Sequence, residues 1–215
     1  MNDKNYKIIM LGPPASGKGT QAEFLSEKLK IPNISVGQLL RDEVDKKGER
    51  AAEIEEQMNS GGLVSNAIVN ELVKNKLSQD EIKQGFIFDG FPRIRIQAKY
   101  LDTLTDISHV LHVEVSDQEV ENRLSGRRTC SECGDVYHLK FNPPKQEDVC
   151  DKCGGKLETR EDDTPAGIKK RLKIYHQETE EVVEFYEKKG VLIKINGEQP
   201  IEDVKKEIFS KLDLE

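Results

Sequence analysis

Short apolar runs alternate with amphipathic stretches along most of this chain. Such runs, bounded by glycine, proline or polar residues, are typical of buried strands. Four runs predict strands of this kind: Tyr6–Leu11, Gly85–Phe88, His109–Val115 and Val191–Ile195. Because helical stretches separate them, the pattern predicts an α/β protein, a doubly wound parallel sheet of about five strands.

Apolar positions spaced three or four apart predict the helices. From Lys18 to Lys30, the residues Ala22, Leu25 and Leu29 recur at this spacing. Ser116 and Glu119 form a capping-box pattern, and Thr164-Pro165 supplies a cap and a first turn. Further helices are predicted at 37–46, 49–59, 65–77, 116 to about 125, 164 to about 189, and 201–212.

Residues 126–163 break this alternation, because glycines, prolines and paired cysteines replace it. Cys130-x-x-Cys133 and Cys150-x-x-Cys153 stand 16 residues apart (134–149), an arrangement that predicts a tetrahedral zinc site. Four thiolates would close the coordination shell, so the Zn²⁺ is expected to be structural. Disulfides and a redox pair are the alternatives, but neither CxxC begins a helix of a βαβ unit.

Composition narrows the class of partner. A net charge of -7 and the absence of Trp argue against broad attraction to nucleic acid or to an anionic membrane. The first residues are polar, and the run Ile8–Leu11 is too short for a signal core or a membrane span. A cytoplasmic protein of one domain with inserts is expected, and in that reducing setting cysteines bind metal sooner than they form disulfides.

The segment between the first strand and the first helix fits the phosphate-binding P-loop, G-x-x-x-x-G-K. Its glycines let backbone N–H groups point at phosphate oxygens, and Lys18 adds a charge at the β- and γ-phosphates. A plain glycine-rich turn is the alternative, but the flanking strand and helix meet the structural requirement of the motif. The expected triphosphate-binding residues are Gly12, Ala15, Ser16, Gly17, Lys18, Gly19 and Thr20.

Several further motifs follow the P-loop in order. The P-loop itself ends in Gly17-Lys18-Gly19-Thr20. The motifs after it are Ile34–Arg41, Asp89-Gly90-Phe91-Pro92-Arg93 with Gln97, Gly126-Arg127-Arg128, Val136-Tyr137-His138, Phe141-Asn142-Pro143-Pro144 and Arg160-x-Asp162-Asp163. In this combination the chain resembles the nucleoside monophosphate kinases, and among them the adenylate kinases with a long, zinc-binding lid. The resemblance spans almost the whole chain. It implies reversible phosphoryl transfer from Mg·ATP to AMP, giving two ADP.

Arginine suits this chemistry because its planar fork binds phosphate bidentately and stays charged. Six arginines fall on positions that contact phosphate in the family: Arg41, Arg93, Arg123, Arg127, Arg160 and Arg171. The resemblance implies that Arg41 and Arg93 hold the acceptor phosphate and Arg127 the donor. The other three are expected around the transferred group, whereas Arg95 lies outside these motifs and is expected at the surface.

Asp89 ends a buried strand, where open α/β sheets place their ligands, and is expected to hold water on Mg²⁺. A cap for the turn at Gly90 is the alternative. By resemblance, the AMP site also includes Val36, Gly62, Leu63, Val64, Gly90, Phe91, Pro92 and Gln97, besides Arg41, Arg93, Arg160 and Arg171. The ATP site adds Arg127, Val136, Tyr137 and Gln199, with His138 close by.

The resemblance also implies three parts and a monomer. The core comprises residues 1–34, 65–125 and 164–215, an arm that binds the monophosphate comprises 35–64, and the zinc-bearing lid comprises 126–163. Closure of the arm and the lid is expected to exclude water from the reaction.

Three residues depart from the family pattern. Val36 and Gln38 stand where adenylate kinases usually have the Thr and Asp of Thr-Gly-Asp, and Ala15 replaces a frequent loop glycine. A kinase for UMP, CMP or a deoxynucleotide is therefore an open alternative. A zinc-ribbon nucleic-acid binder would need a basic face, but acidic residues surround the cysteines. A GTPase would need an Asn-Lys-x-Asp motif, which the sequence lacks.

Overall fold

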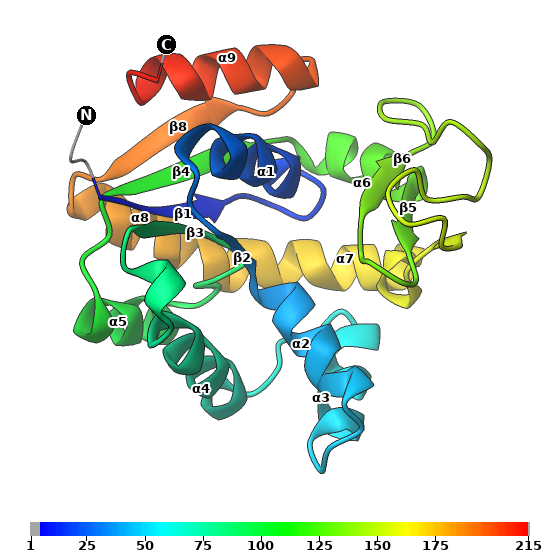
Figure 1. Ribbon diagram of the computed structural model, residues 1–215, viewed down its shortest axis with the longest axis horizontal. Coiled ribbons are helices and arrows are strands. Elements are labelled where there is room, and N and C mark those ends of the chain that lie inside the picture. Colours follow the sequence, from blue (N-terminus) through cyan, green and yellow to red (C-terminus); the bar gives the residue numbers. More distant parts are fainter. Residues whose placement is uncertain (1–4, 215) are drawn as a thin grey trace.

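The centre of the computed structural model, which describes residues 5–214, is a five-stranded parallel sheet (Figure 1). Its strand order is β2-β3-β1-β4-β8, so the chain winds outward from β1 in both directions. The strands are β1 (Tyr6–Leu11), β2 (Asn33–Ser35), β3 (Gly85–Asp89), β4 (His109–Glu114) and β8 (Leu192–Asn196). The predicted α/β fold with a doubly wound sheet is confirmed.

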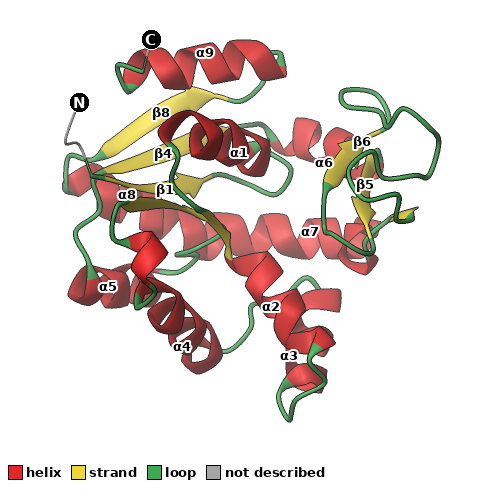
Figure 2. Cartoon of the chain, viewed as in Figure 1, coloured by secondary structure: helices red, strands yellow, loops and turns green. Residues whose placement is uncertain are grey.

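Side chains along the central strand alternate between two apolar clusters. Ile8 and Met10 pack with α1 (Lys18–Leu29) and α9 (Ile201–Lys211), whereas Ile9 packs into the opposite layer. Figure 2 shows helices on both faces of the sheet. The second layer comprises α4 (Asn66–Leu77), α5 (Arg95–Leu104) and α8 (Glu180–Lys188). Coverage of both faces explains why the strands read as continuous apolar runs.

Most helix ends agree with the sequence pattern. Thr164 caps α7 (Pro165–Ile174), and its hydroxyl accepts the N–H of Gly167 at 3.2 Å. The predicted capping box of α6 (Asp117–Ser125) is wrong. The hydroxyl of Ser116 donates to Glu198 at 2.6 Å, and Glu119 accepts from Arg123, so neither residue closes the box.

The sequence pattern does not predict three features. Strand β2 has three residues, too few to show a period. The pattern also gives no prediction for α5, in which the apolar Ile96 is 61% exposed. A π-helical turn, Tyr175–Thr179, separates α7 from α8 within the single helix that the pattern predicts. Two short 3₁₀ turns complete the helical elements, Asp80–Ile82 and Glu161–Asp163.

Two segments stand away from the central sheet (Figure 1). Helices α2 (Val36–Asp45) and α3 (Ala51–Asn59) project beyond the end of β2. Beyond α6 and α7 lies a small antiparallel sheet of order β6-β5-β7. Its strands are β5 (Arg127–Cys130), β6 (Val136–His138) and β7 (Leu157–Glu158). No helix between residues 5 and 214 combines the length and apolar character that crossing a membrane requires.

Candidate active site

The loop between β1 and α1 has the backbone geometry of a phosphate cradle. Gly12 and Gly17 take φ values of 150° and 89°, and Gly17 caps the N-terminus of α1. A methyl group added at Gly12 would lie 2.5 Å from the carbonyl oxygen of Val113, so only glycine fits there. Ala15 has φ 55°, in the left-handed region that favours glycine, so its strain is real.

Lys18 lies in the first turn of α1, close to the end of β3. Its Nζ donates to the carbonyl oxygen of Pro13 at 3.1 Å. Burial lowers the pKa of Lys18 to about 8; the carboxylate of Asp89 opposes this shift, and neighbouring arginines add to it. A lysine in such surroundings gains charge stabilisation from a bound anion.

Asp89 and Ser16 carry polar atoms that the protein leaves unpaired. Asp89 Oδ1 and Ser16 Oγ are buried without a hydrogen-bond partner in the described part of the chain. A methyl group added at Gly19 would lie 3.2 Å from Asp89 Oδ2, so the carboxylate faces the P-loop. A buried carboxylate oxygen without a partner fits a site for Mg²⁺ and its waters beside the triphosphate.

Two adjacent carboxylates organise arginines from different elements. The side chain of Asp163 is 0% exposed, and Arg127 grips it bidentately, with Nε and Nη2 at 2.8 and 2.5 Å. Arg171 Nη1 reaches Asp163 at 2.9 Å and Asp162 at 2.7 Å. Sequence reasoning gives neither aspartate a role; the only signal is their place in one motif with Arg160.

The same cluster crowds cations together. Arg160 Nε donates to Thr129 Oγ1 at 2.9 Å. Burial lowers the pKa of Arg160 to about 9 and that of Arg171 to about 10, and in both cases Arg127 is the strongest neighbouring cause. Burial also lowers the pKa of Arg41. Burial is the main cause of all three shifts, so these arginines are desolvated cations, and Arg160 and Arg171 also lie close enough to Arg127 to feel its charge.

The other two predicted arginines bind backbone oxygens. Arg123 donates to the carbonyl oxygens of Ser16 at 3.4 Å and Gly197 at 2.8 Å, so it ties the P-loop to the turn after β8. Arg93 is exposed, and its Nε donates to the carbonyl oxygen of Gly90 at 3.0 Å. Although the residue is exposed as a whole, surrounding protein lowers the pKa of Arg93, and its guanidinium lies beside the loop that follows β3.

The predicted acceptor residues fall into two groups. Four side chains are buried, so mainly their backbone can meet a ligand: Val36, Val64, Phe91 and Pro92. Gly62, Leu63 and Gly90 are half-buried. Gln97 is buried too, but it is polar: its Oε1 accepts the backbone N–H of Arg93 and its Nε2 donates to Asn66, both at 2.9 Å. This pairing fixes the carboxamide beside Arg93.

The predicted contacts for the ATP base differ in what they can offer. Val136 is 44% exposed, whereas Tyr137 is buried in the lid and its hydroxyl accepts the N–H of Asp151 at 2.9 Å. Gln199 donates through Nε2 to Asn196 and Glu207. Its carbonyl oxygen accepts no hydrogen bond within residues 5–214 that would compete with a base. Thr20, in the P-loop, is half-buried.

The four cysteines converge, as the spacing predicts. Their sulfur atoms all lie within 4.8 Å of one another, with 3.4 Å between Cys130 and Cys153 and 3.7 Å between Cys133 and Cys150. None forms a disulfide. Tetrahedral Zn–S bonds of about 2.3 Å place sulfurs about 3.8 Å apart, so this donor set fits a structural Zn²⁺.

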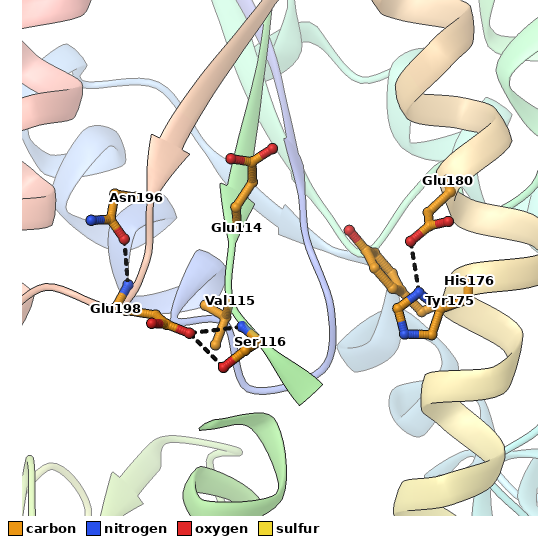
Figure 3. Close-up of a pocket in the computed structure, with 8 residues that line it drawn as sticks. All are labelled: Glu114, Val115, Ser116, Tyr175, His176, Glu180, Asn196 and Glu198. Atoms are coloured by element: carbon orange, nitrogen blue, oxygen red, sulfur yellow. Dashed lines mark hydrogen bonds and ion pairs between the residues drawn. The ribbon is translucent and has the colours of Figure 1, made fainter. Parts of the chain in front are cut away.

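A cavity of about 340 Å³ lies elsewhere, between the ends of β4 and β8 and the π-helical turn (Figure 3). Three carboxylates line it, from Glu114, Glu180 and Glu198, and no P-loop residue does. Glu198 is engaged by the N–H and hydroxyl of Ser116. An acidic lining repels phosphate, so this hollow is not the nucleotide site.

The fold and the site define a P-loop phosphotransferase of the nucleoside monophosphate kinase class: the loop follows the central strand, Asp89 ends its neighbour, and arginines converge from distant segments. The family model described as adenylate kinase matches residues 10–191. The chain is 44% identical to the adenylate kinase of Caldicellulosiruptor bescii over 214 residues, covering 97% of this chain and 100% of the relative. It is 44% identical to the adenylate kinase of Archaeoglobus fulgidus over 211 residues, covering 96% and 97%. The chain belongs to the adenylate kinase family.

Proposed function

We propose that this protein reversibly transfers the γ-phosphoryl group of Mg·ATP to AMP, giving two ADP, and so serves nucleotide homeostasis in the cytoplasm. The observation that carries this proposal is the excess of partly buried cations around Lys18 and Asp163. Phosphoryl transfer between two nucleotides brings many anionic oxygens together, and fixed cations stabilise them without reorganising. Two phosphate chains aligned end to end would neutralise more of this positive charge than one chain alone.

Each group has a definite role in this proposal. The P-loop backbone and Lys18 hold the phosphates of the donor, and Arg127 assists them. Arg41 and Arg93 hold the phosphate of AMP. The transferred group lies among the remaining three arginines, Arg123, Arg160 and Arg171.

Mg²⁺ bound with ATP supplies charge neutralisation at the phosphate oxygens. Asp89 would hold the water bound to that ion, through the carboxylate oxygen that the protein leaves unpaired. The thiolates of the lid hold a structural Zn²⁺, which takes no part in the reaction.

The arm (35–64) and the lid (126–163) close over the core in this proposal. Contact between Gln38 of the arm and Gly134 of the lid supports it, because a methyl group added at Gly134 would lie 2.5 Å from Gln38 Oε1. On closure Gln97 and the backbone of 62–64 surround the acceptor base, and Gln199 with the backbone of 136–137 surrounds the donor base. Water is thereby excluded from the triphosphate. The protein acts as a monomer.

A panel of acceptors tests the proposal. The purified protein with Mg²⁺ and ATP is assayed for ADP against AMP, UMP, CMP and dAMP at equal concentrations. We expect AMP to give the highest kcat/KM. A higher kcat/KM with UMP or CMP would show that a pyrimidine monophosphate is the preferred acceptor. If no acceptor gave a diphosphate, phosphoryl transfer would be rejected.

A further inference from the structure

Gln38 makes an unusual set of contacts for a residue in the first turn of a helix. Its backbone N–H is capped by Ser35 Oγ at 3.4 Å. Its side-chain Oε1 accepts two N–H groups of Arg41, from Nε at 3.0 Å and from Nη2 at 2.7 Å. Its Nε2 donates to Asp42 Oδ1 at 2.8 Å. The carboxamide is therefore fixed at both ends, with no freedom to flip.

The lid covers the outer side of this carboxamide. A methyl group added at Gly134 would lie 2.5 Å from Oε1 and 3.1 Å from Cδ of Gln38. Gly134 follows Cys133 in the first cysteine turn and takes φ 73°, so glycine is required there for conformation as well as for space. The backbone of the lid thus packs on the group that holds Arg41.

We propose that Gln38 is a positioning residue for the acceptor phosphate: it orients the guanidinium of Arg41 and does so most firmly when the lid covers the arm. This inference rests on the proposed function, since it takes Arg41 as a ligand of the AMP phosphate. With Nε and one N–H of Nη2 engaged, Nη1 and the remaining Nη2 hydrogen keep a fixed direction for phosphate.

The neutral charge of Gln38 is part of the inference. Adenylate kinases usually have Asp at this place, and its carboxylate can accept the same N–H groups but adds a negative charge beside Arg41. A carboxamide orients the cation through its oxygen dipole and leaves the charge for the phosphate. Asp42 already lies on the far side of the carboxamide, where it binds Nε2 and makes no hydrogen bond to Arg41.

Two substitutions separate orientation from charge. Gln38→Met keeps the length of the side chain but removes the acceptor, and Gln38→Glu keeps the acceptor but adds a negative charge. We expect Gln38→Met to raise KM for AMP about tenfold, the order expected for losing a charge-assisted hydrogen bond, with kcat changed less than about threefold. We expect Gln38→Glu, which keeps the acceptor, to change KM for AMP less than about threefold. Gln79→Met, at an exposed site, is the matched control and should leave every constant unchanged.

The outcomes distinguish this inference from the proposed function. If the unaltered protein makes ADP but Gln38→Met keeps its KM for AMP, or Gln38→Glu raises KM as much as Gln38→Met does, Gln38 does not position Arg41 through its oxygen, although the proposed function stands. A lower unfolding temperature with unchanged KM for AMP would likewise leave Gln38 with a purely structural role and overturn the inference. If Gln38→Met does not fold, Gln38→Ala, which also removes the acceptor, takes its place beside Gln38→Glu. No ADP from the unaltered protein would overturn both proposals.

Discussion

The central α/β layer and the lid are held together by different forces. In the central layer, Ile8, Ile9 and Met10 are fully buried between two extensive apolar clusters. The lid has one cluster of four side chains, Cys130, Tyr137, Cys150 and Leu157, and two of these are metal-ligand candidates. Burial of so little apolar surface offsets little of the conformational entropy of ordering the lid, and we therefore expect a metal held by the four cysteines to contribute.

The proposed phosphate site lies on the border between these two regions. Arg127 and Arg160 come from the lid, whereas Lys18, Arg93 and Arg171 come from the core. Loss of a solvent-facing arginine should therefore remove activity and leave stability intact, while loss of a cysteine should act first on the stability of the lid. Four substitutions test this contrast.

Arg93→Ala should have the largest effect on turnover. Arg93 is exposed and its side chain holds only the carbonyl oxygen of Gly90, so its removal costs little stability. Arg93 is proposed to hold the acceptor phosphate in line with the transferred group, so its loss should lower kcat by about 10³-fold, the order expected when an arginine that stabilises transition-state charge is removed. Steady-state kinetics and thermal unfolding on the same preparation measure both quantities.

Arg95→Ala is the matched control, because Arg95 is also exposed and stands two positions along the chain. It should keep normal kcat and normal unfolding temperature. Near-normal turnover of Arg93→Ala would remove Arg93 from the reaction. If Arg93→Ala instead unfolded at a clearly lower temperature, its loss of activity could be explained by lost stability. The contrast between core arginines and lid cysteines would then fail.

Asp163→Asn should come next, with kcat lowered about 30-fold. The amide cannot accept both N–H groups of Arg127, which then loses the bidentate pairing that orients it. Because Asp163 is fully buried, stability should fall as well, by about 2 kcal/mol or more, since an arginine is left without its partner. Kinetics and denaturant unfolding check the two effects.

Asp162→Asn is the comparison for that variant. Asp162 is partly exposed, and its ion pair within residues 5–214 is with Arg171, which keeps a second partner in Asp163. Its effect on kcat should be several-fold smaller. Equal losses of kcat in Asp163→Asn and Asp162→Asn would show that the negative charge of the aspartate pair matters and that the bidentate geometry does not.

The contrast between core and border also explains what the sequence could predict. The P-loop and the cysteine pairs are local motifs, and the strands are apolar runs, so each is visible within a short window. The cluster around Asp163 joins Arg127 of β5 to Arg171 of α7, and no local pattern encodes that meeting. Likewise, the hydroxyl of Ser116 binds Glu198 after β8, which displaces the capping box that local spacing favours.

Cys150→Ser tests the metal dependence of the lid. Removing one of four thiolates should leave well under one zinc per chain and lower the unfolding temperature of the lid by about 10 °C, with the core transition unchanged. Activity should fall about tenfold, because Arg127 and Arg160 depend on the lid. Calorimetry with total-metal analysis measures this.

A chelator supplies the control for the cysteine variant. It should lower the unfolding temperature of the lid and the activity of the unaltered protein to the values of Cys150→Ser. The same treatment should leave both quantities unchanged in the variant. Full zinc content in the variant, or a single transition in which core and lid unfold together at a lower temperature, would contradict an independent, metal-dependent lid.

The smallest expected effect is a pH dependence at His176. Its Nδ1 lies 2.6 Å from Glu180 and its Nε2 lies 2.9 Å from Asp117, so the imidazole links the start of α8 to the first turn of α6, the helix that leads into the lid. The hydrogen bond to Glu180, with the added pull of Asp117, raises the pKa of His176. A raised pKa means that the stabilisation is complete below pH 6.5, the ordinary value, and disappears as pH rises through the raised value.

Replacing His176 with Gln isolates this contribution. The ring is half-exposed, so the effect should be small: the variant should unfold about 1–3 °C below the unaltered protein at pH 5.5 and at nearly the same temperature at pH 9. High salt should shrink the difference at pH 5.5, because the pair is open to solvent. A difference that is the same at both pH values would mean that His176 acts by packing on Tyr175, with which it makes an edge-on ring contact, and that its charge plays no part in joining the core to the helix before the lid.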